Sequence, residues 1–114
     1  MITLYYDFVF LNEYINAERR NKYIASKIKR DTTHFVMWSV MHHEKIKTPT
    51  RLKFTWLIPN KRRDLDNIAY AKKYILDGFV KAKLIPSDNL KHIIGFTDEF
   101  EISDKVGVRI EWSE

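Results

Sequence analysis

The segment best suited to chemistry is the run Arg62-Arg63-Asp64-Leu65-Asp66-Asn67. Its two aspartates are two positions apart, and alternate residues of an extended chain point to the same side. Neighbouring carboxylates repel each other unless a cation lies between them, and hard oxygen ligands suit Mg²⁺ or Mn²⁺. Asp64 and Asp66 are therefore candidate metal ligands.

Asp88 is the candidate third ligand, because it lies in a polar loop just beyond the helix that Asp66 is expected to start. A helix of about 16 residues is roughly 24 Å long. Asp88 can therefore reach the pair only if the loop folds back or the helix is shorter. Mg²⁺ keeps several waters and takes one or two carboxylates, so two or three aspartates suffice.

Basic residues lie on both sides of the aspartate pair, at positions 61–63 before it and at Lys72 and Lys73 after it. At ~100° per residue, Lys73 lies nearly in line with Asp66 on one helix, and Lys72 lies well off that line. Cations beside metal-binding acids suggest that a phosphate occupies the same place. The plainer alternative is that Asp66 and Asn67 only cap a helix and that the lysines form a solvated face.

The composition bounds the class of protein. The 114 residues predict one domain, residues 1–114, and a hydrophobic share of 45% predicts a packed core. The absence of cysteine excludes disulfides, a thiol nucleophile and a thiolate zinc site, and three scattered glycines form no phosphate-binding loop. A formal charge of +5 favours an anionic partner. With neither an apolar run of ~20 residues nor a secretory signal, we expect a cytoplasmic protein without a membrane partner.

The hydrophobic pattern predicts an α+β (mixed α/β) fold, a small mixed β-sheet of about four strands with two or three helices. Strands are expected over residues 2–8, 51–58, 92–100 and 106–112. One helix, capped by Asn12, is expected over residues 13–29. Either a second helix follows, capped by Asp31 or Thr32 and ending near Lys45, or the first helix continues as a single bent helix. Another helix, capped by Asp66 or Asn67, is expected over residues 68–83.

The string Arg63-Asp64-Leu65-Asp66-Asn67, the later Leu76-Asp77 and Ile85-Pro86-Ser87-Asp88-Asn89 together resemble the RusA family of Holliday-junction resolvases. The resemblance extends to Gly95 and to the closing strand Val108-Arg109-Ile110-Glu111, and it covers about half of the chain. Two positions depart from the family pattern. Tyr70 stands where many members have a lysine, and Ser87 stands where the family often has an acid.

The resemblance implies a homodimeric, Mg²⁺-dependent endonuclease that resolves four-way DNA junctions by paired symmetric nicks in recombination and repair. Asp64, Asp66 and Asp88 are the implied metal ligands and catalytic acids. When the family pattern is aligned at Leu76-Asp77, its catalytic lysine falls on Lys73. Lys72 is the other candidate. Such a protein would work in the cytoplasm, with the nucleoid of a bacterial host.

Other basic residues are expected to neutralise DNA phosphates, since each such contact raises affinity at low salt. These candidates are Lys61, Arg62, Arg63, Lys72, Arg19, Arg20 and Lys27. A dimer is expected because a junction has two-fold symmetry and two equivalent sites can cut opposite strands. Two alternatives stay open: a non-catalytic nucleic-acid-binding module, and a metal-dependent nuclease or phosphatase that acts on another substrate.

Overall fold

The computed structural model describes residues 1–8, 21–62 and 65–113, with the side chains of Asp66 and Asn67 outside the described part. In chain order, its elements are β1 (Ile2–Leu4), α2 (Lys22–Val40), β2 (Thr50–Ile58), α3 (Leu65–Ala69), α4 (Lys72–Lys81), β3 (Ile93–Ile102) and β4 (Gly107–Ser113). The expected mixed sheet with helices is confirmed.

The four strands form one sheet in the order β1-β4-β2-β3. β4 is antiparallel to both β1 and β2, whereas β2 and β3 are parallel, with Thr50 beside Ile93 and Ile58 beside Ile102. Parallel neighbours need a crossover connection from the end of one strand to the start of the next. Here α3 and α4 supply that crossover.

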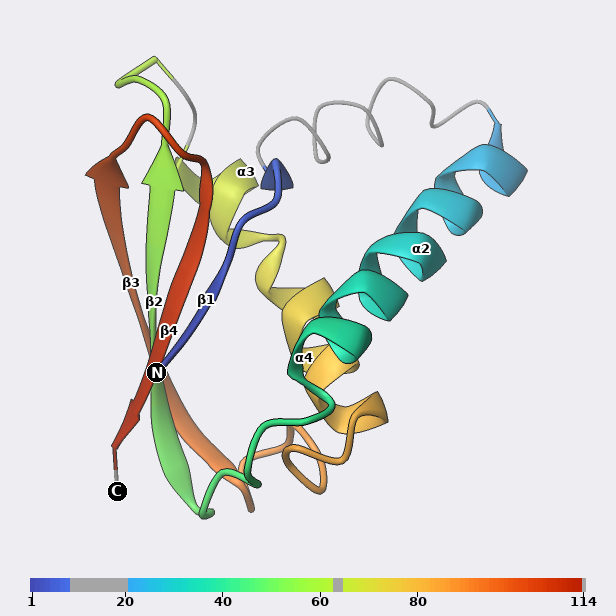
Figure 1. Cartoon of the computed structure of the whole chain (residues 1–114), viewed down its shortest axis with the longest axis vertical. Coiled ribbons are helices and arrows are strands. Elements are labelled where there is room, and N and C mark those ends of the chain that lie inside the picture. The colour runs from blue at the N-terminus through green and yellow to red at the C-terminus, as the bar shows by residue number, and fades with distance from the viewer. Residues whose placement is uncertain (9–20, 63–64, 114) are drawn as a thin grey trace.

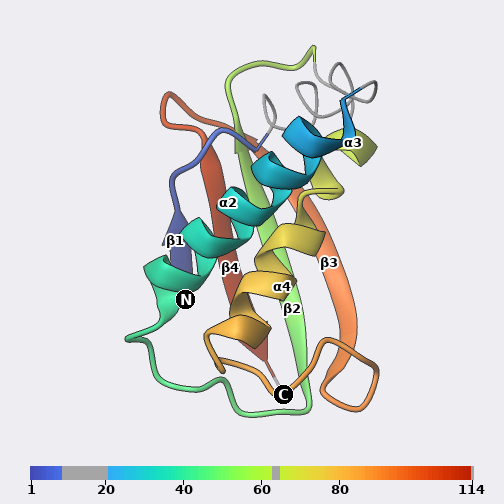
Figure 2. The same cartoon turned by 90° about the vertical axis from the view of Figure 1, so that its right-hand side faces the viewer.

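Helices α2 and α4 cover one face of the sheet (Figures 1 and 2). β2 faces them with Phe54 and Trp56, which are fully buried because their alternate positions point to that side. α4 contributes Ile75 and Phe79, also fully buried. The other face of the sheet carries charged pairs, such as Lys53 with Glu99, whose Nζ and Oε2 atoms are 3.3 Å apart.

The first described helix differs from expectation. The proposed cap Asn12 lies outside the described residues, and α2 begins instead after Asn21, whose side-chain oxygen accepts a hydrogen bond from the Ile24 amide. The predicted helix start at Asp31 or Thr32 is wrong, because α2 runs through both residues. Thr32 bonds through its hydroxyl to the carbonyl of Ile28, so it stays inside the helix. One helix is observed, and it ends at Val40 rather than near residue 45.

The helix expected over residues 68–83 is divided into α3 and α4 by a turn at Tyr70 and Ala71. The amides of Ala71, Lys73 and Tyr74 each bond to the carbonyl three residues earlier, which is 3₁₀ geometry. Asp66 and Asn67 lie within α3, so the prediction that one of them caps the helix is wrong. The apolar stripe is confirmed: Ile68, Ala71, Ile75, Leu76 and Phe79 are buried, and Val80 is half-buried.

Candidate functional site

The aspartate motif follows directly after the buried strand β2. In the turn that leads to it, the side-chain oxygen of Asn60 accepts a hydrogen bond of 2.9 Å from the Arg62 amide, which shapes the backbone as an Asx turn. Lys61 and Arg62 are exposed there. Arg63 and Asp64 lie outside the described residues, and Asp66 is known by its helical backbone in α3. The extended-chain argument for this pair therefore does not hold at Asp66.

Asp88 and Lys73 line the same cleft, although 15 positions separate them in the sequence. α4 has only 10 residues and the chain after it turns back. Lys83 makes that turn with a positive φ of 59°, and the Leu84 amide bonds to the carbonyl of Phe79. The loop acid and the helix lysine thus line one cleft, whereas the sequence predicted that Asp88 would meet Asp64 and Asp66.

The cleft has a volume of about 350 Å³ and lies between α2, α4 and the loop after α4. Its lining residues are Lys29, Arg30 and Thr33 from α2, Lys73, Tyr74, Asp77, Val80 and Lys81 from α4, and Ser87 and Asp88 from the loop. Four cations and two carboxylates leave a surplus of positive charge. Among the residues that the structure describes, none of the four cations is held in an ion pair. The cleft is therefore suited to an anionic group.

α3 and the loop that carries Asp88 lie toward opposite ends of β2. Ile93, five residues after Asp88, pairs with Thr50 at the start of β2, whereas α3 follows Ile58 at its end. A strand of nine residues spans ~26 Å at ~3.3 Å per residue. Both ribbon views show this separation (Figures 1 and 2). Asp88 and Lys73 thus line one cleft, and the structure does not bring the Asp88 loop to α3.

Within the described ranges, no three histidine or acidic side chains lie close enough together to hold a metal ion. The side chains of Asp64 and Asp66 are not among those described. The expected three-aspartate centre therefore rests on the sequence motif, and Asp88 is its one member with a described side chain.

Lys72 is held inside the fold. Its Nζ atom lies 2.7 Å from Oδ2 of Asp98, and the other oxygen of Asp98 accepts a hydrogen bond of 3.0 Å from the indole of Trp56. The ammonium also lies over the rings of Phe54 and Phe96, 5.4 and 4.7 Å from their centroids. This partner set separates Lys72 from its neighbour, since Lys73 is exposed and lines the cleft.

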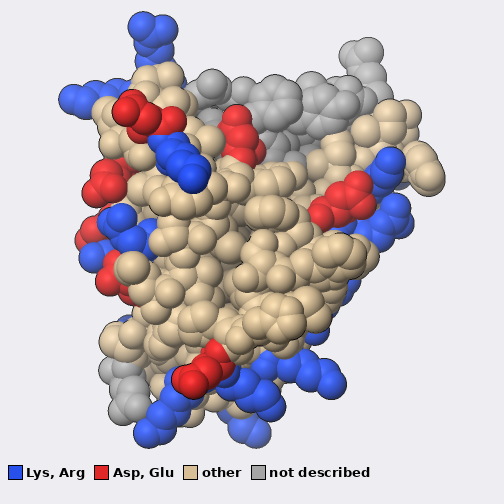
Figure 3. Space-filling view, viewed as in Figure 1, with Lys and Arg blue, Asp and Glu red and all other residues tan. Residues whose placement is uncertain are grey.

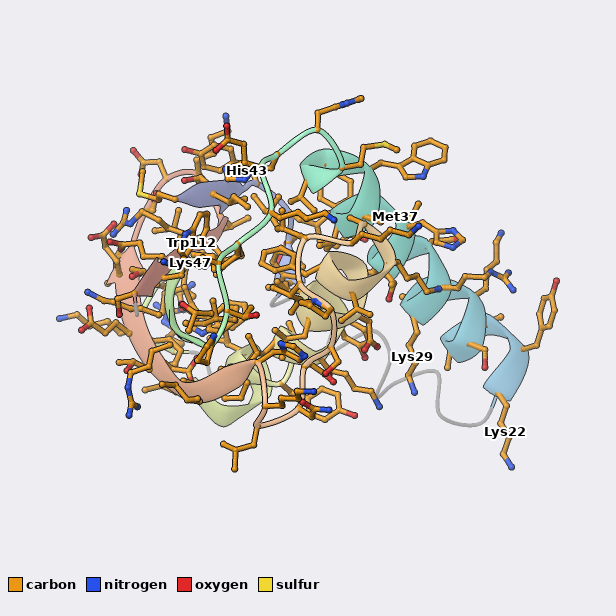
Figure 4. All side chains as sticks on the ribbon, turned by 90° about the horizontal axis from the view of Figure 1, so that it is seen from below. Lys22, Lys29, Met37, His43, Lys47 and Trp112 are labelled. Atoms are coloured by element: carbon orange, nitrogen blue, oxygen red, sulfur yellow. The ribbon has the colours of Figure 1, made fainter. Side chains whose placement is uncertain are left out.

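The remaining basic candidates are Lys27 in α2 and two arginines that precede this helix in the sequence. Lys27 is exposed, and Arg19 and Arg20 lie outside the described residues. Figure 3 shows basic side chains on the side of the molecule where α2 lies, next to an acidic group, and others at the lower edge and on the opposite side. Lys22 and Lys29 extend from the same side of that helix (Figure 4). A basic helix face thus adjoins the cleft, since Lys29 belongs to both.

Tyr74 is a residue of the cleft that the sequence pattern did not single out. Its side chain is 2% exposed, and its buried hydroxyl has no hydrogen-bond partner among the described residues. Burial, followed by the nearby Tyr70 and Asp77, raises the pKa of Tyr74 to about 12. The hydroxyl therefore remains protonated and able to donate at neutral pH. Its helical spacing from Ala71 is also that of an ordinary core aromatic, so no sequence signal identifies it.

Comparison with protein-family models, curated protein sequences and solved structures found no match. In the part of the chain that the structure describes, none of the helices has both the length and the apolar character that crossing a membrane requires.

Proposed function

We propose that the chain is a metal-dependent endodeoxyribonuclease that resolves four-way DNA junctions. One observation carries the proposal: Lys73 and Asp88, assigned to one site from the sequence, line a single cleft with a surplus of cations. The aspartate motif adds support, since it follows a buried strand directly and continues into α3, which precedes the helix of Lys73. An exposed basic face on α2 adjoins the same cleft.

The donor set fits the proposed ion, because Asp64 and Asp66 offer carboxylate oxygens, which Mg²⁺ and Mn²⁺ prefer. Mg²⁺ supplies a bound water of lowered pKa and a positive charge for the phosphate oxygens. In the proposal Asp64 and Asp66 hold the ion. Asp88, the third ligand expected from the sequence, remains in the cleft beside Lys73.

The proposed reaction is hydrolysis of a phosphodiester. A water oxygen forms a bond to phosphorus while the bond to the 3′ oxygen breaks, and the products are a 5′-phosphate and a 3′-hydroxyl. The ammonium of Lys73 would stabilise charge that develops on the phosphate or on the leaving oxygen. Lys61 and Arg62, exposed beside the motif, would hold neighbouring backbone phosphates through charge-assisted hydrogen bonds.

The proposed substrate also implies an oligomeric state and a cellular location. A four-way junction has two-fold symmetry, so a homodimer with two equivalent sites would nick opposite strands. The function would place the protein with the nucleoid in the cytoplasm of a bacterial host.

The test compares a four-way junction with a linear duplex and a flap of the same sequence, each incubated with the chain and Mg²⁺. Paired nicks confined to the junction, and lost on chelation of the metal, support the proposal. Metal-dependent cutting of the duplex or flap instead identifies a nuclease with another substrate. Binding without any cutting identifies a nucleic-acid-binding module and rejects the enzyme.

A further inference from the structure

Strand β3 leaves one edge of the sheet open. In the order β1-β4-β2-β3 it pairs with β2 alone, so its other side has no neighbouring strand in the part of the chain that the structure describes. β3 has ten residues and no proline, and its pairing with β2 is regular from Gly95 to Ile102. The free amides and carbonyls of a long edge strand can pair with another chain. This edge is therefore a candidate interface.

The apolar side chains of β3 are also uncovered. Phe96 lies beside Leu52 and Ile102 beside Ile58, on the face of the sheet that carries the helices. Leu52 and Ile58 are 1% and 5% exposed, whereas Phe96 and Ile102 are 45% and 52% exposed. Figure 2 shows that α2 and α4 lie over the other strands and leave most of β3 uncovered. An apolar strip on a surface is typical of a contact with another protein.

The charges along this edge change sign from one end to the other. At the start, Arg51 lies over Gly95, since a Cβ atom there would be 2.6 Å from its Nη1. Lys91 lies two residues before the strand, and neither cation forms an ion pair with a described residue. Near the end, Glu99 and Glu101 each pair with a cation of their own chain, but both side chains remain more than half exposed. The edge thus has a basic start and an acidic end.

This pattern is complementary to itself. In an antiparallel pair the start of one strand lies opposite the end of the other. A second copy of β3, related by a two-fold axis, would place its acidic end against Arg51 and Lys91, and the same contact would recur on the other side of the axis. A nucleic acid is negative along its whole length, so the acidic end would repel it. The charges therefore favour a second copy of this chain as the occupant.

We infer that two copies of this chain form a dimer by antiparallel pairing of their β3 strands, which joins the two sheets into one. Phe96 and Ile102 would then be covered by the partner. The two-fold axis of such a pair is perpendicular to the sheet, so the α2 helices of both copies lie on the same face. The inference thus identifies the interface of the expected homodimer. The use of that dimer in cutting a junction rests on the proposed function.

The test measures the mass of the chain by sedimentation over a range of concentrations, without DNA and with metal chelated. We expect a reversible dimer. Ile102→Lys places a charge in the apolar strip and should raise the Kd of the dimer about tenfold. Trp38→Lys is the matched control, because Trp38 is 67% exposed but lies on α2, and it should leave the Kd unchanged. Dimer formation should also slow hydrogen exchange at amides of residues 95–102.

A charge exchange tests the direction of the pairing. Arg51→Glu puts like charges opposite each other and should weaken the dimer. Adding Glu101→Lys should recover most of the loss, because opposite charges then face each other again. Denaturation curves establish that each variant is folded.

Two results would overturn the inference. One is a chain that stays monomeric at every concentration measured. The other is a dimer that Ile102→Lys and Arg51→Glu leave intact and that Trp38→Lys disrupts, which identifies α2 as the interface. These readouts need no cleavage. A dimer through β3 that never cuts a junction would reject the proposed function and leave this inference standing, whereas junction cleavage by a monomer would reject the inference alone.

Discussion

The Nζ atom of Lys72 lies 2.7 Å from Oδ2 of Asp98, in an ion pair that is largely withdrawn from solvent. Asp98 also binds the indole of Trp56, so this pair joins α4 to β2 and β3. The adjacent Lys73 is exposed and lines the cleft. Two neighbouring lysines of one helix thus differ in their surroundings, and the difference favours Lys73 as the lysine that meets a substrate.

Replacing Lys72 should therefore affect mainly the stability of the fold, whereas replacing Lys73 should affect mainly junction cleavage. Lys72→Met leaves Asp98 without its cation, and we expect the free energy of unfolding to fall by about 1–3 kcal/mol. Lys73→Met should leave stability within ~0.5 kcal/mol, because surface substitutions usually do, and should reduce junction cleavage strongly. Chemical denaturation and a nicking assay measure the two effects. Equal loss of stability in both variants would contradict the distinction.

The contact between α2 and α4 should be sensitive to one added methyl group. A Cβ atom on Gly78 would lie 2.6 Å from Cγ1 of Val36 and 3.1 Å from the Met37 amide nitrogen. Gly78→Ala should therefore destabilise the fold by about 1–3 kcal/mol through overpacking, even though alanine favours helices. Thermal unfolding measures the change. The double variant with Val36→Ala should recover part of the loss, and no recovery would contradict a clash at this contact.

The raised pKa of Tyr74 predicts that the fold loses stability at alkaline pH. Its pKa is raised from 10.0 to about 12 in the folded chain, so the unfolded chain loses the proton first as the pH rises. Loss of that proton favours unfolding, and the stabilisation present below pH 10 should disappear as the pH approaches 12. Denaturation curves of the unmodified chain and of Tyr74→Phe separate this effect from other titrations. An identical alkaline loss in both would show that Tyr74 is not responsible.

Mn²⁺ in place of Mg²⁺ should reveal which aspartates share the ion. The register of β3 against β2 places the loop of Asp88 away from α3, so paramagnetic broadening of NMR signals should centre on residues 64–67. Amides of Ser87, Asp88 and Asn89 should be broadened less. The same experiment on Asp66→Asn should abolish the effect. Equal broadening at both places would show that all three aspartates converge on one ion.

Much of the fold follows from local hydrophobic patterns. The apolar run at residues 51–58 predicts β2, and the helical spacing of Ile75 and Phe79 predicts the buried side of α4. The division at Tyr70 and Ala71 does not follow, because Ile68, Ala71 and Ile75 fit one continuous helix. Thr32 resembles a helix start, and only its bond to the Ile28 carbonyl shows that it is interior.

The candidate site was predictable in part for a similar reason. Residue type, residue order and the family resemblance assigned Lys73 and Asp88 to one site; both line one cleft, and their catalytic role stays a prediction. Tyr74 was missed because the cleft that it lines exists only once α2, α4 and the loop are assembled. The ion pair of Lys72 likewise depends on Asp98, 26 positions away, which no local pattern connects to it.

The role of the aspartate motif is tested by Asp64→Asn, assayed for both binding and Mg²⁺-dependent nicking of a four-way junction. The substitution preserves the size of the side chain and removes one negative charge. We expect nicking to be lost and junction binding to be kept or strengthened, because a charge that repels phosphate is gone. Undiminished nicking by Asp64→Asn, or a parent chain that binds the junction and never cuts it, would contradict metal-dependent hydrolysis at this motif.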